Sequence, residues 1–150
     1  MALKVAFDDP SAGWVALTII SFEEEVQVIG SYTPTDSFLG LINALHAMLQ
    51  VEGAQVSTWN EEPAEVDLCF TKTGDRIDST LRRFPDRRRM KGTGEKILEV
   101  SGTFRGVCMP FWRALRNLQT RRTPAQLREG FHREFPSGEL DRLSAAIEEA

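Results

Sequence analysis

Four carboxylates lie close together in this 150-residue sequence: Glu61, Glu62, Glu65 and Asp67. Two carboxyl groups at close range can act as general acid and general base when their environments differ. Neighbouring acidic residues beside a proline are also typical of a hydrated loop, and Pro63 follows Glu62 directly. The sequence therefore favours a solvated loop here over a catalytic pair.

Other motifs for catalysis, metal binding or nucleotide binding are weak. Asp8 and Asp9 are adjacent acids in a loop without a third ligand at a recognisable spacing. His46 and His132 belong to no HExxH or nucleophile motif. The glycines of residues 92–96 resemble a phosphate-binding loop, but Lys96 leads into a predicted strand and not into a helix. We therefore predict no metal, no cofactor and no enzymatic activity.

The basic residues form a more specific pattern. Six of them lie within ten positions and four more follow on a predicted helix, which is the usual footprint of a phosphate-binding protein. The first group is Arg82, Arg83, Arg87, Arg88, Arg89 and Lys91, and the second is Arg113, Arg116, Arg121 and Arg122. Only Phe84 adjoins the first group, so platforms for stacking bases are not evident. Nucleic-acid binding is the alternative interpretation.

The acidic first half of the chain predicts a protein-binding face. Complementary charge speeds the encounter with a basic partner, and aromatic anchors supply the affinity. The predicted members of this face are Asp8, Asp9, Glu23, Glu24, Glu25, Trp59, Glu61 and Glu62, with Trp14 as another candidate anchor. Binding of a basic protein is the leading interpretation.

The charges are sorted along the chain. Residues 1–70 contain eleven acidic residues and one basic residue, residues 71–122 contain five and fourteen, and residues 123–150 contain six and three. Such asymmetry bears on partners and association and says nothing about reaction chemistry. Both binding interpretations assume that the two signs lie on separate patches of the folded surface. The same opposition of charge is compatible with a homodimer.

Composition predicts a single domain over residues 1–150. The chain is 41% hydrophobic, which is enough to bury a core without a disulfide or a metal. Cys69 and Cys108 lack the spacing of a zinc or redox motif and favour reduced thiols. The first ten residues do not resemble a signal peptide, and no apolar run is long enough for a membrane span. We expect a cytoplasmic protein.

Hydrophobic periodicity predicts the elements that position these residues. Alternating and β-branched runs predict strands over residues 3–7, 14–20, 23–31, 55–59, 65–71, 76–84 and 97–104. Helical spacing predicts helices over residues 35–51, 108–122, 123–134 and from 137 onwards, with Pro34 at the first helical position of the first one. Residues 85–95 are expected to form an exposed basic loop. The fold predicted is α+β: a mostly antiparallel sheet of six or seven strands with one long inserted helix and a helical C-terminus packed on one face.

Three segments resemble a group of small uncharacterised bacterial proteins. They are SYTPTD at residues 31–36 with the helix ending in HAML, WNEEP at residues 59–63, and Phe135-Pro136 followed by Leu140 and Leu143. Members of that group look like immunity proteins of polymorphic toxin systems. The resemblance implies binding and assigns no binding residue.

The sequence as a whole predicts a non-catalytic protein-binding module. We expect an immunity-type inhibitor that binds a basic toxin or enzyme through its acidic N-terminal half.

Overall fold

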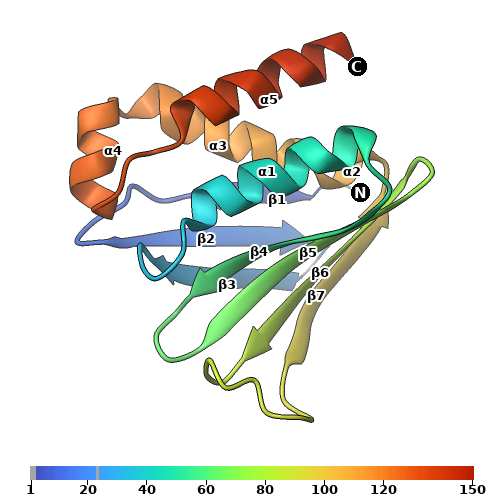
Figure 1. Ribbon diagram of the computed structural model, residues 1–150, viewed down its shortest axis with the longest axis horizontal. Coiled ribbons are helices and arrows are strands. Elements are labelled where there is room, and N and C mark those ends of the chain that lie inside the picture. Colours follow the sequence, from blue (N-terminus) through green and yellow to red (C-terminus); the bar gives the residue numbers. More distant parts are fainter. Residues whose placement is uncertain (1–2, 23) are drawn as a thin grey trace.

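Seven antiparallel strands form two sheets in this computed structural model, which describes residues 3–22 and 24–150 (Figure 1). The N-terminal sheet contains, in order, β1 (Lys4–Phe7), β2 (Trp14–Ser21) and β3 (Glu24–Ser31). The second sheet contains, in order, β4 (Gly53–Asn60), β5 (Glu65–Thr73), β6 (Arg76–Phe84) and β7 (Glu95–Gly102). The predicted α+β class is confirmed, whereas the single sheet of six or seven strands is not.

The strands divide into two sheets between β3 and β4. At the outer edge of β3, backbone N–H and C=O groups form hydrogen bonds with side chains and not with another strand. The backbone N–H of Ile29 donates to Oε2 of Glu61 at 3.1 Å, and the carbonyl of Gln27 accepts from Nη2 of Arg83 at 3.0 Å. Close packing helps to join the sheets, since a Cβ added at Gly30 would lie only 2.6 Å from the ring of Trp59. The sheets therefore meet through side chains.

Helix α1 (Ser37–Gln50) is the long inserted helix. Its apolar stripe is buried, with Leu41, Leu45 and Met48 each at 0% exposure, as its periodicity predicts. The helix begins later than expected, because Asp36 is the N-cap and its Oδ1 accepts from the N–H of Leu39 at 3.1 Å. Pro34 therefore lies in the preceding loop and not in the first turn.

The C-terminal part of the chain is helical. It contains α2 (Phe104–Val107), α3 (Met109–Arg121), α4 (Pro124–Phe131) and α5 (Ser137–Glu149). Thr123 and Gln126 form the capping box that starts α4, as predicted. The last predicted strand is too long, since β7 ends at Gly102 and Phe104 opens α2. In residues 3–22 and 24–150, no helix has the length and apolarity needed to cross a membrane.

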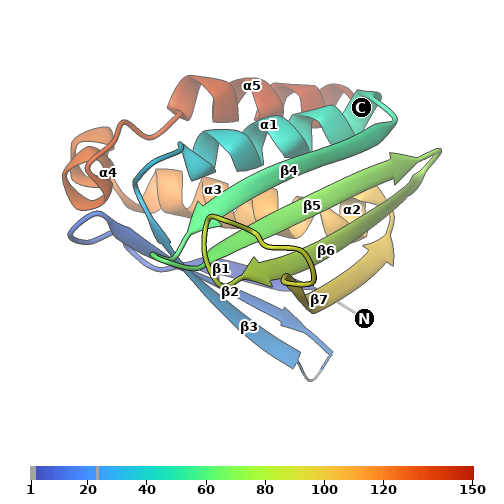
Figure 2. The same cartoon turned by 60° about the horizontal axis from the view of Figure 1, so that its bottom comes forward.

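Helices α1, α3 and α5 lie together on one side of the strands (Figures 1 and 2). An aromatic cluster joins α1 and α4 to both sheets: Phe38 of α1 lies 5.2 Å from Phe7, 5.5 Å from Trp59 and 5.0 Å from Phe131 of α4, measured between ring centroids. Trp59 has 0% exposure. The prediction that Trp59 anchors a partner is therefore wrong, because its indole belongs to the core.

Candidate functional site: a cleft between three charged loops

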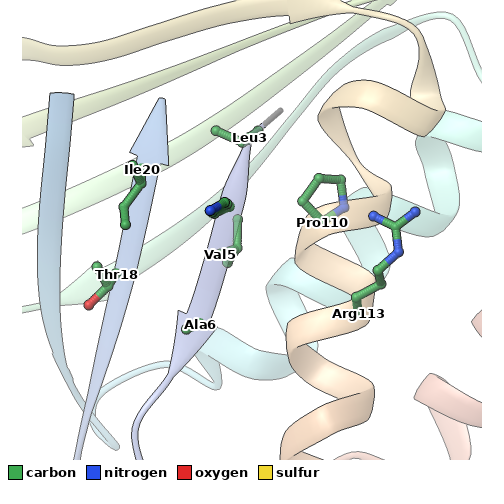
Figure 3. A pocket seen from close by; sticks show the side chains of 8 residues that line it. Leu3, Val5, Ala6, Thr18, Ile20, Pro110 and Arg113 are labelled. Carbon is green, nitrogen blue, oxygen red and sulfur yellow. The ribbon is translucent and has the colours of Figure 1, made fainter. Parts of the chain in front are cut away.

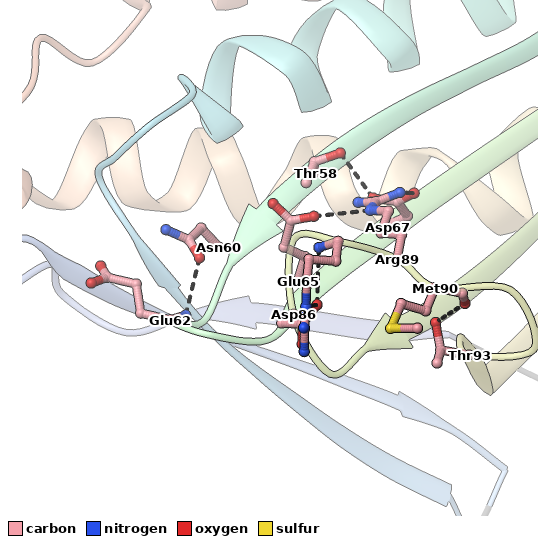
Figure 4. A network of polar contacts seen from close by, with 10 residues as sticks. Thr58, Asn60, Glu62, Glu65, Asp67, Asp86, Arg89, Met90 and Thr93 are labelled. Carbon is pink, nitrogen blue, oxygen red and sulfur yellow. Dashed lines mark hydrogen bonds and ion pairs between the residues drawn. The ribbon is translucent and has the colours of Figure 1, made fainter.

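Arg89 joins the basic loop to the acidic half of the chain. Its Nε lies 2.9 Å from Oε1 of Glu65, and its two terminal nitrogens contact the carboxylate of Asp67 at 2.7 and 2.8 Å (Figure 4). Thr58 donates to the same carboxylate at 2.8 Å. The side chains of Glu65 and Asp67 are only 12% and 11% exposed. A two-pronged guanidinium–carboxylate pair of this kind is strong and fixes orientation.

The loop of residues 85–94 is folded back over the second sheet because of this contact (Figure 2). The guanidinium of Arg89 lies 4.2 Å from the ring centre of Phe84, and its backbone adopts the left-handed φ of 46°. Hydrogen bonds to Asp67 and Glu65 raise the pKa of Arg89 above its usual value. Nη1 of Arg82 holds the far end of the loop through the carbonyl of Gly94 at 2.9 Å.

A second ion pair holds the turn between β4 and β5. Nε and Nη2 of Arg83 donate to the two oxygens of Glu61 at 2.8 and 3.1 Å, and the Glu61 side chain is 16% exposed. The same two residues satisfy the edge of β3. Glu61 and Arg83 therefore connect β3, β6 and this turn. Their charges pair with each other and contribute to the fold.

Three of the four arginines in the second basic group form contacts within the fold. Arg121 and Arg122 both pair with Asp9, and Arg121 donates in addition to the carbonyl of Phe7 at 3.0 Å. Hydrogen bonds from Arg122 and then from Arg121 lower the pKa of Asp9. Arg116 donates to Gln119 on its own helix.

The predicted separation of acidic and basic patches is therefore wrong. Early carboxylates pair with later guanidinium groups at three places: Glu61 with Arg83, Glu65 and Asp67 with Arg89, and Asp9 with Arg121 and Arg122. The cause is that Arg83 of β6 reaches the β4–β5 turn, the loop after β6 folds back onto β5, and the end of α3 lies beside the loop after β1.

The predicted acidic face is not one surface either. The N–H of Asp8 pairs with Ala16 on β2, whereas Glu24 pairs with Ser21 at the opposite end of that strand. At about 3.3 Å per residue, these ends are roughly 17 Å apart. Glu25 is exposed near the hairpin end, and Glu23 lies outside the described residues.

Of the six basic residues predicted to bind phosphate, Arg87 and Lys91 are the ones without an ion pair or hydrogen bond from the side chain to residues 3–22 and 24–150. Arg88 pairs with Asp86 at 2.9 Å but keeps 76% of its side chain exposed. Its hydrogen bonds lower the pKa of Asp86.

A cleft of about 530 Å³ lies among three loops. It brings together members of the predicted acidic face and of the predicted phosphate-binding group. It is lined by Thr33, Pro34, Asn60, Glu62, Pro63, Asp86, Arg87 and Arg88. The lining residues come from the loop before α1, the β4–β5 turn and the loop before β7. Glu62, Arg87 and Arg88 were predicted from sequence as site residues, although for different partners.

Asn60 clamps two of the three loops. Its side chain is buried, its Nδ2 donates to the carbonyl of Thr33 at 2.7 Å, and its Oδ1 accepts from the backbone N–H of Glu62 at 3.0 Å. Glu62 adopts a left-handed φ of 49°, which a residue with a side chain holds only where its surroundings fix it. No sequence motif singles out Asn60, because its role depends on a partner 27 positions away.

The cleft combines charged side chains of both signs with apolar surface. Exposed groups of both signs, Glu62 and Arg87, stand beside the rings of Pro34 and Pro63. The carboxylates of Glu62 and Asp86 would repel a phosphate backbone. In the described part of the chain, no three His, Cys, Asp or Glu side chains are placed to hold a metal ion.

The two histidines lie elsewhere. The ring of His132 contacts that of Tyr32 edge to face at 5.2 Å, where it ends α4 in a left-handed conformation. His46 is half-buried on α1. Neither residue lines the cleft.

Comparisons of the chain with protein-family models, with curated proteins and with solved structures found no match, so the resemblance to immunity proteins stays a prediction.

Proposed function

We propose that this protein is a polypeptide-binding module whose partner docks in the cleft between the three loops. The proposal is supported by a cleft that contains charges of both signs. The loops around this cleft are held in place by poorly exposed ion pairs. A surface that is already ordered loses less conformational entropy when a partner binds. Loops fixed on a rigid scaffold are common places for recognition.

The lining suggests how a partner would be recognised. Glu62 is exposed and suits a basic side chain of the partner, whereas Arg87 suits a carboxylate. Pro34 and Pro63 offer apolar surface between them. We therefore propose that Glu62, and not the whole acidic N-terminal half, contacts a basic group of the partner.

Inhibition of a toxin or enzyme is the form of binding that the resemblance to immunity proteins implies. Such a protein acts by occupying its partner's surface and needs no catalytic group of its own. Co-expression with the partner tests this form: the wild type should relieve toxicity, and variants that lose binding should not.

Nucleic-acid binding is the second candidate, because Arg87, Arg88 and Lys91 are exposed on one loop. With about three phosphate contacts, the logarithm of affinity should fall with the logarithm of salt with a slope near −2.7. Duplex binding with such a slope, lost when all three become alanine, would favour this candidate over a polypeptide partner.

Site-specific photo-crosslinking tests the main proposal. A photoreactive residue placed at Arg87 should form an adduct with a defined polypeptide in the source cell, and the same residue at Asp75 should not. Asp75 is a matched control because it is exposed in the β5–β6 turn, at the opposite end of β5. Adducts with nucleic acid alone, or equal adducts at both positions, would contradict the proposal.

Charge reversal then tests the cleft with the purified partner. Glu62→Lys and Arg87→Glu should each weaken binding by tenfold or more, in line with the loss of one or two charge-assisted contacts. Lys96→Glu, on β7, is the control and should leave the affinity unchanged. Unchanged binding by both cleft variants would place the partner elsewhere.

A further inference from the structure

The outer face of the N-terminal sheet is a second surface with a distinct charge pattern. Residues alternate between the two faces of a strand, and Val15, Leu17 and Ile19 of β2 point into the core at 0–2% exposure. The opposite face presents Lys4 and Ala6 of β1, Trp14, Ala16, Thr18 and Ile20 of β2, and Glu25, Gln27 and Ile29 of β3. Trp14 and Ile29 are 36% and 45% exposed. This face is therefore largely apolar.

Its charges lie at opposite edges. The strand register places Lys4 and Glu25 on either side of Ile20 in one cross-strand row. Arg113 of α3 lies on the β1 side of the sheet (Figure 3). It lines the same open cavity of about 470 Å³ as Lys4 and Ile20. None of Lys4, Glu25 and Arg113 has an ion pair among residues 3–22 and 24–150. The face thus has positive charges, Lys4 and Arg113, at its β1 edge and a negative charge, Glu25, at its β3 edge.

Both edges of this sheet are closed to another strand. Helix α3 runs beside β1, where Arg121 donates to the carbonyl of Phe7 at 3.0 Å. The edge of β3 is satisfied by Glu61 and Arg83. Covered edges prevent strand addition and leave the outer face as the accessible part of the sheet.

We propose that this face binds a second copy of the same chain, face to face, about a two-fold axis parallel to β2. Such a rotation lays β1 of one copy over β3 of the other. Lys4 of each copy then lies opposite Glu25 of the other copy, which gives two ion pairs. The two copies of Ile20 meet at the axis. An isologous contact of this kind requires a self-complementary patch, and the row Lys4, Ile20, Glu25 is one.

The size of the face sets the strength of the dimer. Strands β2 and β3 are eight residues long and β1 is four, and the strands lie about 4.8 Å apart. The face therefore covers at most roughly 15 Å by 25 Å, which is less than the ~800 Å² per partner of a standard interface. The dimer is therefore weak and dissociates on dilution. Because its ion pairs lie at the rim, added salt weakens it further.

Sedimentation equilibrium of charge-reversed variants tests this proposal. The wild type should dimerise reversibly at low salt as the protein concentration rises. Lys4→Glu and Glu25→Lys should each raise the dissociation constant by about tenfold or more, because like charges then face each other at both rims. The combined variant should restore the wild-type dissociation constant, since the pairs reform with their signs exchanged.

Glu24→Lys is the matched control, because it makes the same charge change one residue away and on the other face of β3. It should leave the dissociation constant unchanged. A wild type that remains monomeric at every concentration, or a combined variant that does not recover, would overturn the proposal. Glu62→Lys in the cleft should not affect the dimer, so the two surfaces are tested separately.

Discussion

Arg89 shows why a basic residue cannot be assigned to a ligand from its neighbours in sequence alone. The run Arg87, Arg88, Arg89 is uniform in the sequence, yet its members have different roles in the fold. Arg89 binds Glu65 and Asp67, Arg88 binds Asp86, and Arg87 faces the cleft. The sequence predicts the exposed loop correctly, but the choice among three identical side chains depends on tertiary contacts.

Replacing Arg89 with alanine should destabilise the protein by about 2 kcal/mol, because Asp67 is left without its charge partner in a poorly exposed place. Arg87→Ala removes the same side chain two positions earlier and should change stability by less than about 0.5 kcal/mol. Urea unfolding of the two variants measures both effects. Equal losses would show that the Arg89 contacts do not hold the loop.

Cys108 should make stability depend on pH in the alkaline range. Burial raises the pKa of its thiol to about 12, whereas an unfolded chain ionises it near its ordinary value of about 8.5. A raised pKa in the folded state gives a contribution that is complete below pH ~8.5 and is lost as the pH rises towards 12.

The measurement is the difference in unfolding free energy between the wild type and Cys108→Ala. Above pH ~8.5, the wild type should lose stability relative to the variant by up to about 1.4 kcal/mol per pH unit. A difference that does not change with pH would contradict the buried, neutral thiol.

The sequence predicts the bounds of an element best where residues within that element determine them. Residues 76–84 form a strand with the predicted bounds, and the capping box at Thr123 starts α4. The break between the sheets could not be predicted, because it depends on contacts of Arg83 and Glu61 with a strand more than thirty positions from Glu61. Hydrophobic periodicity describes one segment at a time and contains no information on such pairs.

Gly30→Ala tests the junction of the sheets. A Cβ there would meet the rigid ring of Trp59 at 2.6 Å, so the substitution should cost about 1–3 kcal/mol. Gly106→Ala is the control, because its nearest contact would be an ordinary 3.7 Å and alanine favours the short helix α2. Thermal unfolding of both variants compares them. An unaffected Gly30→Ala would mean that β3 and Trp59 do not pack closely.

At the scale of the whole molecule, charges that are sorted along the sequence are partly paired in space. Asp9, Glu61, Glu65 and Asp67 all pair with arginines of the later, basic segment. The strong local balances of the sequence therefore describe how the chain holds itself together more than what it binds. The cleft and the outer sheet face are what the pairing leaves exposed, and neither can be identified from counts of charge.

The cleft is preformed only if Arg89 holds the loop of residues 85–94 in place before any partner binds. Backbone ¹⁵N relaxation of the free protein at neutral pH measures this most directly. We predict order parameters near 0.85 for residues 87–90 in the wild type and values below about 0.6 in Arg89→Ala. Values below about 0.6 in the wild type itself would contradict the preformed cleft.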